Sequence, residues 1–526
     1  MNPQPVLIDG EWRPSVGKDT FQAVNPATCE ALPEQYPVSP WSEIEQAVSA
    51  ADRAFREMLG MPGEKLAKFL ERFADRLEGR KEELVNIANL ETGLPKQPRL
   101  ADVEFPRTTG QLRQAAAAAR NATWQRPVID TKAGIRSILA PIGPVVVFGP
   151  NNFPFAFNGA AGGDFAAAIA AGNPVIAKGH PSHPGTTKIL AEEAAAAAVD
   201  TDMPRGLVQM IYRTSHADGA KLVSHSKIGA CGYTGGRKTG LVLKEAADRV
   251  GNPIYLELSS INPIFILPGA LEERLDKVAE EFVGSCLAGT GQFCTNPGLV
   301  ILLAGPLTDK FVETVQDRFT NAPVGTMLGE GVQKSMSASI EAIRDAGAKV
   351  LTGGESGGGN GYCYRNTLLL VNGKSFLSNS EHLQTEAFGN SSLFVIAETP
   401  DELIAVTDHL EGNLTGCIYS ATGDQDEAIY GKIAPRLRHK VGRLLNDKMP
   451  TGVAVSPAMN HGGPFPATGH PGFTSVGIPA AITRFAMLQS YDAVRPHRLP
   501  PLLQDWNPGG VWRQIDGVCS TGDVGA

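Results

Sequence analysis

Short apolar segments alternate with helical segments from residue 145 onward, and this rhythm constrains the fold more than any other feature of the chain. Val145-Val146-Val147-Phe148 has the composition of a buried strand, and the alanine-rich residues 164–171 are typical of a helix. Further strands are expected at 174–177, 206–212, 228–233, 254–258, 298–303, 348–351, 368–371, 393–396, 416–419 and 441–445. Strands separated by helices predict βαβ units and parallel sheets, so we expect an α/β fold with two such regions.

The length and composition describe a large globular protein of more than one domain. With 526 residues the chain is too long for a single compact core. Hydrophobic residues make up 42% and charged residues 19%, which is ordinary for a soluble protein. The formal net charge of −8 argues against a nucleic-acid partner, which would require a basic face.

The cysteines and the chain start indicate the compartment. Seven cysteines without a Cys-x-x-Cys motif predict neither a disulfide framework nor a metal site. The first residues lack the basic and then apolar pattern of a signal peptide, and no apolar run approaches the length of a bilayer span. We therefore expect a cytoplasmic protein with no membrane partner.

Glu257 and Cys294 are the candidate catalytic pair. Glu257 follows the apolar segment Ile254-Tyr255-Leu256, where a buried carboxylate is costly unless it is paired or used. Cys294 lies among Gly, Gln, Thr and Asn, where a thiolate forms more easily than in the apolar surroundings typical of a structural cysteine. A thiol and a proton acceptor can together oxidise an aldehyde through a thioester. A salt-bridged structural glutamate and an inert cysteine are the alternatives.

Three further polar groups follow strands, where ligands of open α/β sheets bind. Asn152 in the turn after Phe148 is a candidate hydrogen-bond donor or a simple turn former. Lys178 stands where many dinucleotide enzymes have an acidic residue, so it suits a 2′-phosphate or is a solvated lysine. Gly235 and Gly240 mark either a phosphate-binding turn or an ordinary helix start, and the usual G-x-G-x-x-G pattern is absent.

In order and spacing these motifs resemble the aldehyde dehydrogenase superfamily, from about Leu7 to Trp512. The resemblance implies that Cys294 is the nucleophile, Glu257 the general base and Asn152 the oxyanion donor. It further implies a cofactor site for NADP or NAD, formed by Phe148, Gly149, Lys178, His180, Pro181, His216, Thr234, Gly235, Gly236, Gly240, Leu258, Glu386 and Phe388. Pro181 and His216 replace the threonine and arginine of NADP-selective members, and Pro181 also replaces the glutamate of NAD-selective members. Either dinucleotide is therefore expected.

The same resemblance indicates a substrate class. Segments 107–113, 178–186, 260–263 and 463–468 are similar to the branch that includes 2-oxoglutarate semialdehyde (2,5-dioxopentanoate) dehydrogenase. An acidic aldehyde needs a cation at the tunnel mouth, and Arg107 is expected to supply it, with helix salt bridges of Arg107 and Arg113 as the alternative. The expected substrate-binding residues are Arg107, Gln111, Phe153, Phe293 and Thr295. A broad-specificity or fatty aldehyde dehydrogenase and a cysteine-dependent esterase or amidase remain alternatives.

By the same resemblance the chain divides into a Rossmann-type cofactor domain, an α/β catalytic domain and a small β oligomerisation element. The expected boundaries are 1–124 and 142–274 for the cofactor domain, 275–450 for the catalytic domain, and 125–141 with 480–500 for the oligomerisation element. Residues 451–479 are expected to return to the cofactor domain, and 501–526 to form a tail. The expected assembly is a homodimer or homotetramer whose partner is a small aldehyde.

Overall fold

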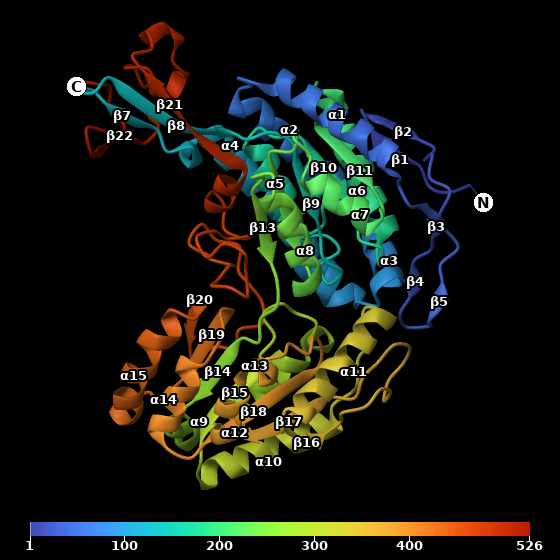
Figure 1. Ribbon diagram of the computed structural model, residues 1–526, viewed down its shortest axis with the longest axis vertical. Coiled ribbons are helices and arrows are strands. Elements are labelled where there is room, and N and C mark those ends of the chain that lie inside the picture. The colour runs from blue at the N-terminus through green and yellow to red at the C-terminus, as the bar shows by residue number, and fades with distance from the viewer. Residues whose placement is uncertain (1, 526) are drawn as a thin grey trace.

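The strands of the protein form three large sheets; the first two lie one above the other along the long axis of the molecule, and the third projects to the side of the upper lobe (Figure 1). The structure is a computed structural model that describes residues 2–525. Each of the strand segments expected from the sequence contains a strand, and the α/β fold is confirmed. No helix within the described residues is both long enough and apolar enough to cross a bilayer.

The first sheet has the strand order β13-β12-β9-β10-β11-β1-β2, and its five strands from β13 to β11 are parallel. Its strands are β1 (Val6–Ile8), β2 (Glu11–Arg13), β9 (Val145–Phe148), β10 (Val175–Lys178), β11 (Val208–Ile211), β12 (Ala230–Thr234) and β13 (Ile254–Glu257). The helices of this part are α1 (Trp41–Met58), α2 (Gly63–Gly79), α3 (Lys81–Thr92), α4 (Phe105–Asn121), α5 (Gly163–Ala170), α6 (Pro184–Asp200), α7 (His216–Val223) and α8 (Arg237–Asp248).

Helices cover both faces of this sheet, which is why β9 is apolar at every position. Val145 and Val147 pack with residues of α2, α4, α5 and α6 on one face. Val146 and Phe148 pack with residues of α1, α7 and α8 on the other face, as the two-residue period of a strand requires.

The chain order reverses at β9, and this reversal locates the site. The chain proceeds from β9 through β10 to β11 on one side and then crosses to β12 and β13 on the other. Register places Phe148 opposite both Lys178 and Tyr233, and Thr234 opposite Glu257. The polar groups that follow these strands therefore meet at one carboxyl edge, where open α/β sheets bind ligands.

The second sheet has the order β16-β17-β18-β15-β14-β19-β20. Its strands are β14 (Pro263–Ile266), β15 (Leu299–Leu303), β16 (Lys349–Thr352), β17 (Thr367–Asn372), β18 (Ser391–Ala397), β19 (Asn413–Tyr419) and β20 (Val441–Asn446). Its helices are α9 (Pro268–Leu287), α10 (Pro306–Asn321), α11 (Glu330–Asp345), α12 (Gly373–Ser378), α13 (Ser380–Leu383), α14 (Pro400–Asp408) and α15 (Glu427–Arg438). Separate apolar clusters pack on its two faces.

The cofactor part was expected to continue to residue 274, and the structure corrects this boundary. β14 lies in the middle of the second sheet, between β15 and β19. The chain therefore passes from the first sheet to the second between Glu257 and Pro263. The all-buried residues of β14 can form a strand in either sheet, and only the pairing with β15 and β19 decides which.

The third sheet, β21-β8-β7-β22-β23, projects from one end of the molecule (Figure 1). It comprises β7 (Val128–Asp130), β8 (Ile135–Pro141), β21 (Ala486–Asp492), β22 (Arg513–Ile515) and β23 (Val518–Ser520). Residues 501–526 were expected to form a separate tail, but β22 pairs with β7 and β23 pairs with β22. Buried Arg513 donates to the backbone oxygens of Gln504 and Asp505, which ties this segment to the sheet.

Short elements complete the described chain. Two-residue strands pair as β3 (Thr20–Phe21) with β6 (Tyr36–Pro37) and β4 (Val24–Asn25) with β5 (Glu30–Ala31). Short helical turns are η1 (Lys96–Glu104), η2 (Thr123–Gln125), η3 (Arg205–Leu207), η4 (Ala288–Gly291), η5 (Asp424–Asp426), η6 (Ala480–Phe485), η7 (Pro496–Arg498) and η8 (Pro501–Leu503).

Candidate active site

Glu257 and Cys294 reach the same place from different sheets. Glu257 is the last residue of β13, and it forms an antiparallel bridge with Thr468. Cys294 lies in the segment between η4 and β15. The Asn262 side-chain amide donates to the backbone oxygens of Cys294 at 2.9 Å and Asn296 at 2.8 Å. These contacts hold both segments where the two sheets face each other.

His461 joins the two groups, and sequence reasoning did not identify it. Its Nε2 lies 2.8 Å from Glu257 Oε1 and 3.4 Å from Cys294 Sγ. Ser475 Oγ donates to the other carboxylate oxygen of Glu257 at 2.8 Å, and His461 is 2% exposed. Within residues 2–525 this is the one His/Cys/acid group whose donor atoms could hold a metal ion, all within 4.8 Å of one another. His461 and Ser475 come from an irregular segment without a period, so no sequence signal pointed to them.

Burial and charge set the protonation of the pair. Burial raises the pKa of Glu257, but the charge of His461 and the hydrogen bonds from His461, Ser475 and Cys294 outweigh it and lower the pKa below its usual value. Burial and then the charge of Glu257 raise the pKa of the Cys294 thiol well above its usual value. At rest the site therefore holds a thiol beside a carboxylate.

Asn152 lies at the same site with one donor in use. Its Nδ2 donates to the backbone oxygen of Gln292 at 3.0 Å, and the residue is buried. An amide nitrogen carries two N–H groups, so one remains for a ligand. Arg99 Nη2 donates to the Asn152 backbone oxygen at 2.9 Å and fixes the turn from the other side.

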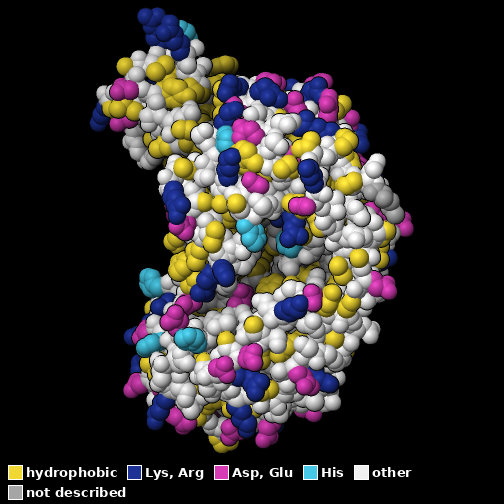
Figure 2. Space-filling view, turned by 45° about the vertical axis from the view of Figure 1, so that its right-hand side comes forward, with side chains coloured by type: hydrophobic (Ala, Val, Ile, Leu, Met, Phe, Trp, Pro, Cys, Tyr) yellow, Lys and Arg dark blue, Asp and Glu magenta, His cyan; other side chains and the backbone are white. Residues whose placement is uncertain are grey.

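A cavity of about 430 Å³ connects these residues with those expected to hold a cofactor. Figure 2 shows a hollow between the two lobes of the molecule, with basic and histidine side chains at its rim. The expected residues that line the cavity are Asn152, Thr234, Gly235, Gly236, Glu257, Leu258, Cys294, Glu386 and Phe388. The loops after β9, β12 and β13 thus meet the second lobe across one space.

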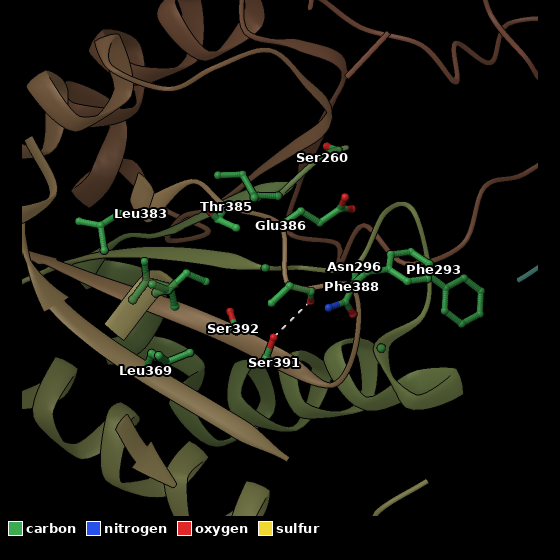
Figure 3. Close-up of a pocket in the computed structure, with 16 residues that line it drawn as sticks. Ser260, Phe293, Asn296, Leu369, Leu383, Thr385, Glu386, Phe388, Ser391 and Ser392 are labelled. Carbon is green, nitrogen blue, oxygen red and sulfur yellow. Dashed lines mark hydrogen bonds between the residues drawn. The ribbon is translucent and has the colours of Figure 1, made fainter. Parts of the chain in front are cut away.

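Glu386 and Phe388 reach this cavity from the second lobe. Figure 3, which draws a pocket that shares Glu386 and Phe388 with this cavity, shows the Glu386 carboxylate below Ser260, with Asn296 and Phe293 of the cysteine segment lower in the view. Burial raises the pKa of Glu386 to about 7, although hydrogen bonds from Ser260 and Ser259 oppose the rise.

Four expected cofactor residues lie beyond this cavity, around the ends of β10 and β11. Lys178 ends β10, and burial and then the nearby charge of Arg213 lower its pKa to about 8. His180 Nδ1 accepts from the Ser182 N–H at 3.1 Å, and burial lowers the pKa of this imidazole well below its usual value. Pro181 is half-buried, and His216 is exposed at the start of α7. The cation beside Lys178 is therefore Arg213, which sequence reasoning missed.

The remaining cofactor glycines serve packing more than ligand contact. A Cβ on Gly240 would lie 2.5 Å from Leu258 Cδ2, and one on Gly149 would lie 2.6 Å from the Phe157 backbone oxygen. Gly149 follows Phe148 at the end of β9. A Cβ on Gly236, by contrast, would meet nothing within 4 Å, so this position leaves an open face before α8.

A second cavity, of about 410 Å³, lies against α4 and η1. Arg107, Phe153 and Phe293 line it, while Gln111 is buried behind Arg107 and accepts from its Nε at 3.1 Å. Thr295 is also buried and does not line either cavity.

Arg113 is excluded from this cavity because it forms exposed salt bridges. Its guanidinium contacts Glu78 at 2.7 Å and Asp75 at 2.8 Å. The salt-bridge alternative therefore holds for Arg113 and not for Arg107.

Comparison with known proteins identifies relatives over nearly the whole chain. A family model described as "Aldehyde dehydrogenase family" matches residues 12–463. A protein named "Alpha-ketoglutaric semialdehyde dehydrogenase 2" from Azospirillum brasilense is 37% identical, covering 95% of this chain and 96% of its own. "Alpha-ketoglutaric semialdehyde dehydrogenase" from Acinetobacter baylyi is 35% identical, with coverages of 97% and 98%.

Solved structures show the same fold. Lactaldehyde dehydrogenase from Escherichia coli superposes with a TM-score of 0.80 at 22% identity, covering 93% of this chain and 98% of its own. The NAD+ complex of aldehyde dehydrogenase from Bacillus cereus gives a TM-score of 0.79 at 21% identity, with coverages of 94% and 97%.

Proposed function

The chain belongs to the aldehyde dehydrogenase family, and on that basis we propose that it oxidises 2-oxoglutarate semialdehyde to 2-oxoglutarate with NADP or NAD. The observation that carries the proposal is the convergence of Cys294, Glu257 and Asn152 at one cavity. A thiol, a carboxylate and an amide donor are the groups that oxidation through a thioester requires.

The cavity residues fit a nicotinamide dinucleotide. Gly236 opens the start of α8 toward the cavity, and helix starts favour phosphate groups. Glu386 offers a carboxylate to ribose hydroxyls, and Lys178 with Arg213 offers a cationic edge that suits a 2′-phosphate. The nicotinamide, when bound, supplies the hydride acceptor for the oxidation.

The chemical steps of the chain itself follow from the geometry. Cys294 Sγ forms a bond to the aldehyde carbon, and the thiol proton passes to the Glu257 carboxylate. The aldehyde oxygen becomes an alkoxide, which the remaining Asn152 N–H and the Cys294 backbone N–H stabilise. One such donor contributes roughly 10²–10³ in rate.

Loss of hydride from the alkoxide carbon leaves the Cys294 thioester, and Glu257 releases to solvent the proton that it took from the thiol. Hydrolysis then uses the Glu257 carboxylate again. The carboxylate removes a proton from water, the water oxygen attacks the thioester carbon, and the bond to Cys294 Sγ breaks, after which the leaving thiolate takes up a proton. The low pKa of Glu257 keeps it ionised for this role. Its two oxygens are already held by His461 and Ser475, which fixes the direction of the free lone pairs.

The substrate assignment rests on the relatives and on Arg107. Two relatives above 30% identity are named as α-ketoglutaric semialdehyde dehydrogenases. Arg107 lines the second cavity, which we call the mouth cavity, and its cation there matches the carboxylate of such a substrate. A long-chain aliphatic aldehyde has no carboxylate that could pair with Arg107.

The test is the formation of reduced nicotinamide with a panel of aldehydes, with NADP and NAD in parallel. Wild-type protein should oxidise the acidic semialdehyde, and Cys294→Ser should abolish turnover while Cys286→Ala retains it. Cys286 is buried in the core and serves as the matched thiol. If the protein hydrolyses esters and its turnover of aldehydes does not depend on a dinucleotide, the proposal is contradicted and a thiol hydrolase is favoured.

We extend the proposal to a cytoplasmic homo-oligomer. The third sheet carries the exposed large apolar side chains of Leu488 (64%) and Val518 (67%), and Trp512, directly before β22, is 61% exposed. Such a surface is typical of a protein interface. Light scattering should show a dimer or tetramer, and Leu488→Asp should shift it toward the monomer, whereas a monomeric wild type would contradict this extension.

A further inference from the structure

Several residues that line the mouth cavity have polar side-chain atoms without a hydrogen-bond partner, and these residues indicate which ligand the cavity could bind. Its inner wall contains Phe153 and Phe293, which are the chain neighbours of Asn152 and Cys294. A substrate whose aldehyde reaches Cys294 would therefore extend its other end into this space.

Three buried side-chain atoms around the cavity have no hydrogen-bond partner within residues 2–525. They are Arg99 Nε, Arg107 Nη2 and Gln114 Oε1, and all three residues line the cavity. Buried polar groups in folded proteins are almost always hydrogen-bonded, so a cluster of exceptions points to a missing partner. Water, or a polar ligand that displaces it from the cavity, would supply this partner.

The charge in the cavity comes from Arg107. Arg99 forms an ion pair with buried Glu104, which neutralises its charge. Arg107 forms no salt bridge within the described chain, and its Nε is held by Gln111 at 3.1 Å. Its guanidinium carbon also lies 5.1 Å from the ring centre of Phe157. A half-buried guanidinium that is held in place and forms no salt bridge favours an anionic ligand, and a carboxylate matches its two parallel donors.

Gln114 lies on the same face of α4. Residues 107, 111 and 114 follow the i, i+4, i+7 spacing of one helix face, and Gly110 leaves room between them. A side-chain amide can turn by half a rotation, so it presents either an acceptor or a donor to a ligand. It can thus donate to a keto oxygen that lies beside the carboxylate.

We propose that Arg107 and Gln114 form a two-point recognition site for the 2-oxo acid end of the aldehyde. Arg107 binds the carboxylate, and Gln114 binds the adjacent keto oxygen. The inference rests on the proposed function and deepens it, because it assigns the two functional groups of 2-oxoglutarate semialdehyde to separate residues. Gln111 was expected to bind the substrate; it holds Arg107 in place instead, and Gln114 faces the cavity.

The experiment compares three five-carbon aldehydes that lose one group at a time. These are 2-oxoglutarate semialdehyde, glutarate semialdehyde, which lacks the keto group, and pentanal, which lacks both groups. Arg107→Met should raise KM for both acids by about 100-fold relative to pentanal, because a bidentate charged contact is lost. Gln114→Leu should raise KM about tenfold for the 2-oxo acid and not for glutarate semialdehyde.

Controls separate recognition from folding. Arg113→Met changes the same helix at an exposed salt bridge and should leave all three KM values unchanged. Arg107→Lys should recover part of the preference for the acids because it restores the charge. Gln114→Glu keeps the size but adds a negative charge, so it should raise KM for both acids even if the leucine variant does not fold.

The outcomes distinguish this inference from the proposed function. A wild-type enzyme that prefers pentanal over both acids would refute the proposed substrate and this site together. A different result would refute the role of Gln114 alone. In that result the wild type prefers the 2-oxo acid over glutarate semialdehyde, and Gln114→Leu keeps this preference unchanged. Equal effects of Arg107→Met on all three aldehydes would show that Arg107 acts on structure and would refute the carboxylate contact.

Discussion

Replacement of His461 by phenylalanine should move the acidic limb of the pH profile upward. His461 Nε2 lies 2.8 Å from Glu257 Oε1, and its charge is the largest effect that opposes burial of that carboxyl. A hydrogen bond to a charged group contributes about 1.5–3 kcal/mol. At about 1.4 kcal/mol per pKa unit, its loss should raise the pKa of Glu257 by about 1–2 units.

The direction of the shift in the pH profile follows from the ionisation state in which Glu257 acts. Glu257 acts as a base only when ionised, and its lowered pKa keeps it ionised down to acidic pH. In His461→Phe the effect of burial on the pKa of Glu257 is less opposed, so the ionised fraction of Glu257 falls at a higher pH. The plot of log kcat/KM against pH should therefore bend about 1–2 units higher than in wild type.

The assay is initial-rate kinetics of the semialdehyde across pH, with circular dichroism as the control for folding. His461→Gln retains an N–H donor and should shift the limb less. Ser475→Ala removes the 2.8 Å bond to the other oxygen of Glu257 and should shift it in the same direction. An acidic limb in His461→Phe that coincides with wild type would refute the reasoning.

Three further predictions follow from other parts of the site. Arg213→Gln should lower kcat/KM about tenfold with NADP and little with NAD, because it removes a cation beside Lys178; equal losses with both would contradict this. KM for the dinucleotide should fall as pH rises through about 7, where Glu386 ionises, and Glu386→Gln should abolish this dependence; a pH step that persists in the variant would assign it elsewhere. Gly291→Ala should lower Tm and kcat, since its φ is +66° and a Cβ would lie 2.1 Å from the Gly389 backbone oxygen, at a cost of about 1–3 kcal/mol. Gly284→Ala meets no neighbour and lies inside helix α9, so it should leave kcat unchanged and should not lower Tm.

Local patterns were sufficient for the elements and for selecting Glu257 and Cys294 as candidates, which the fold brings together. β9 is apolar at each position because both of its faces are covered, so composition alone predicts it. Glu257 is visible because a carboxylate directly after an apolar strand is costly without a role. Local patterns were insufficient for β14, whose apolar residues fit either sheet until their partners are known.

The residues that complete the site required the folded chain. Arg99, Arg113 and Gln114 all lie near Arg107 in sequence, and only the contacts show that Arg113 is paired at the surface while Gln114 faces the cavity. His461 and Ser475 lie in an irregular segment more than 200 residues after Glu257. Side-chain chemistry and strand-end position are encoded locally, so the sequence alone determined which reaction this chain performs. Burial, charge compensation and pairing arise between distant segments, so only the tertiary structure decided how the base is held and which arginine remains free for a substrate.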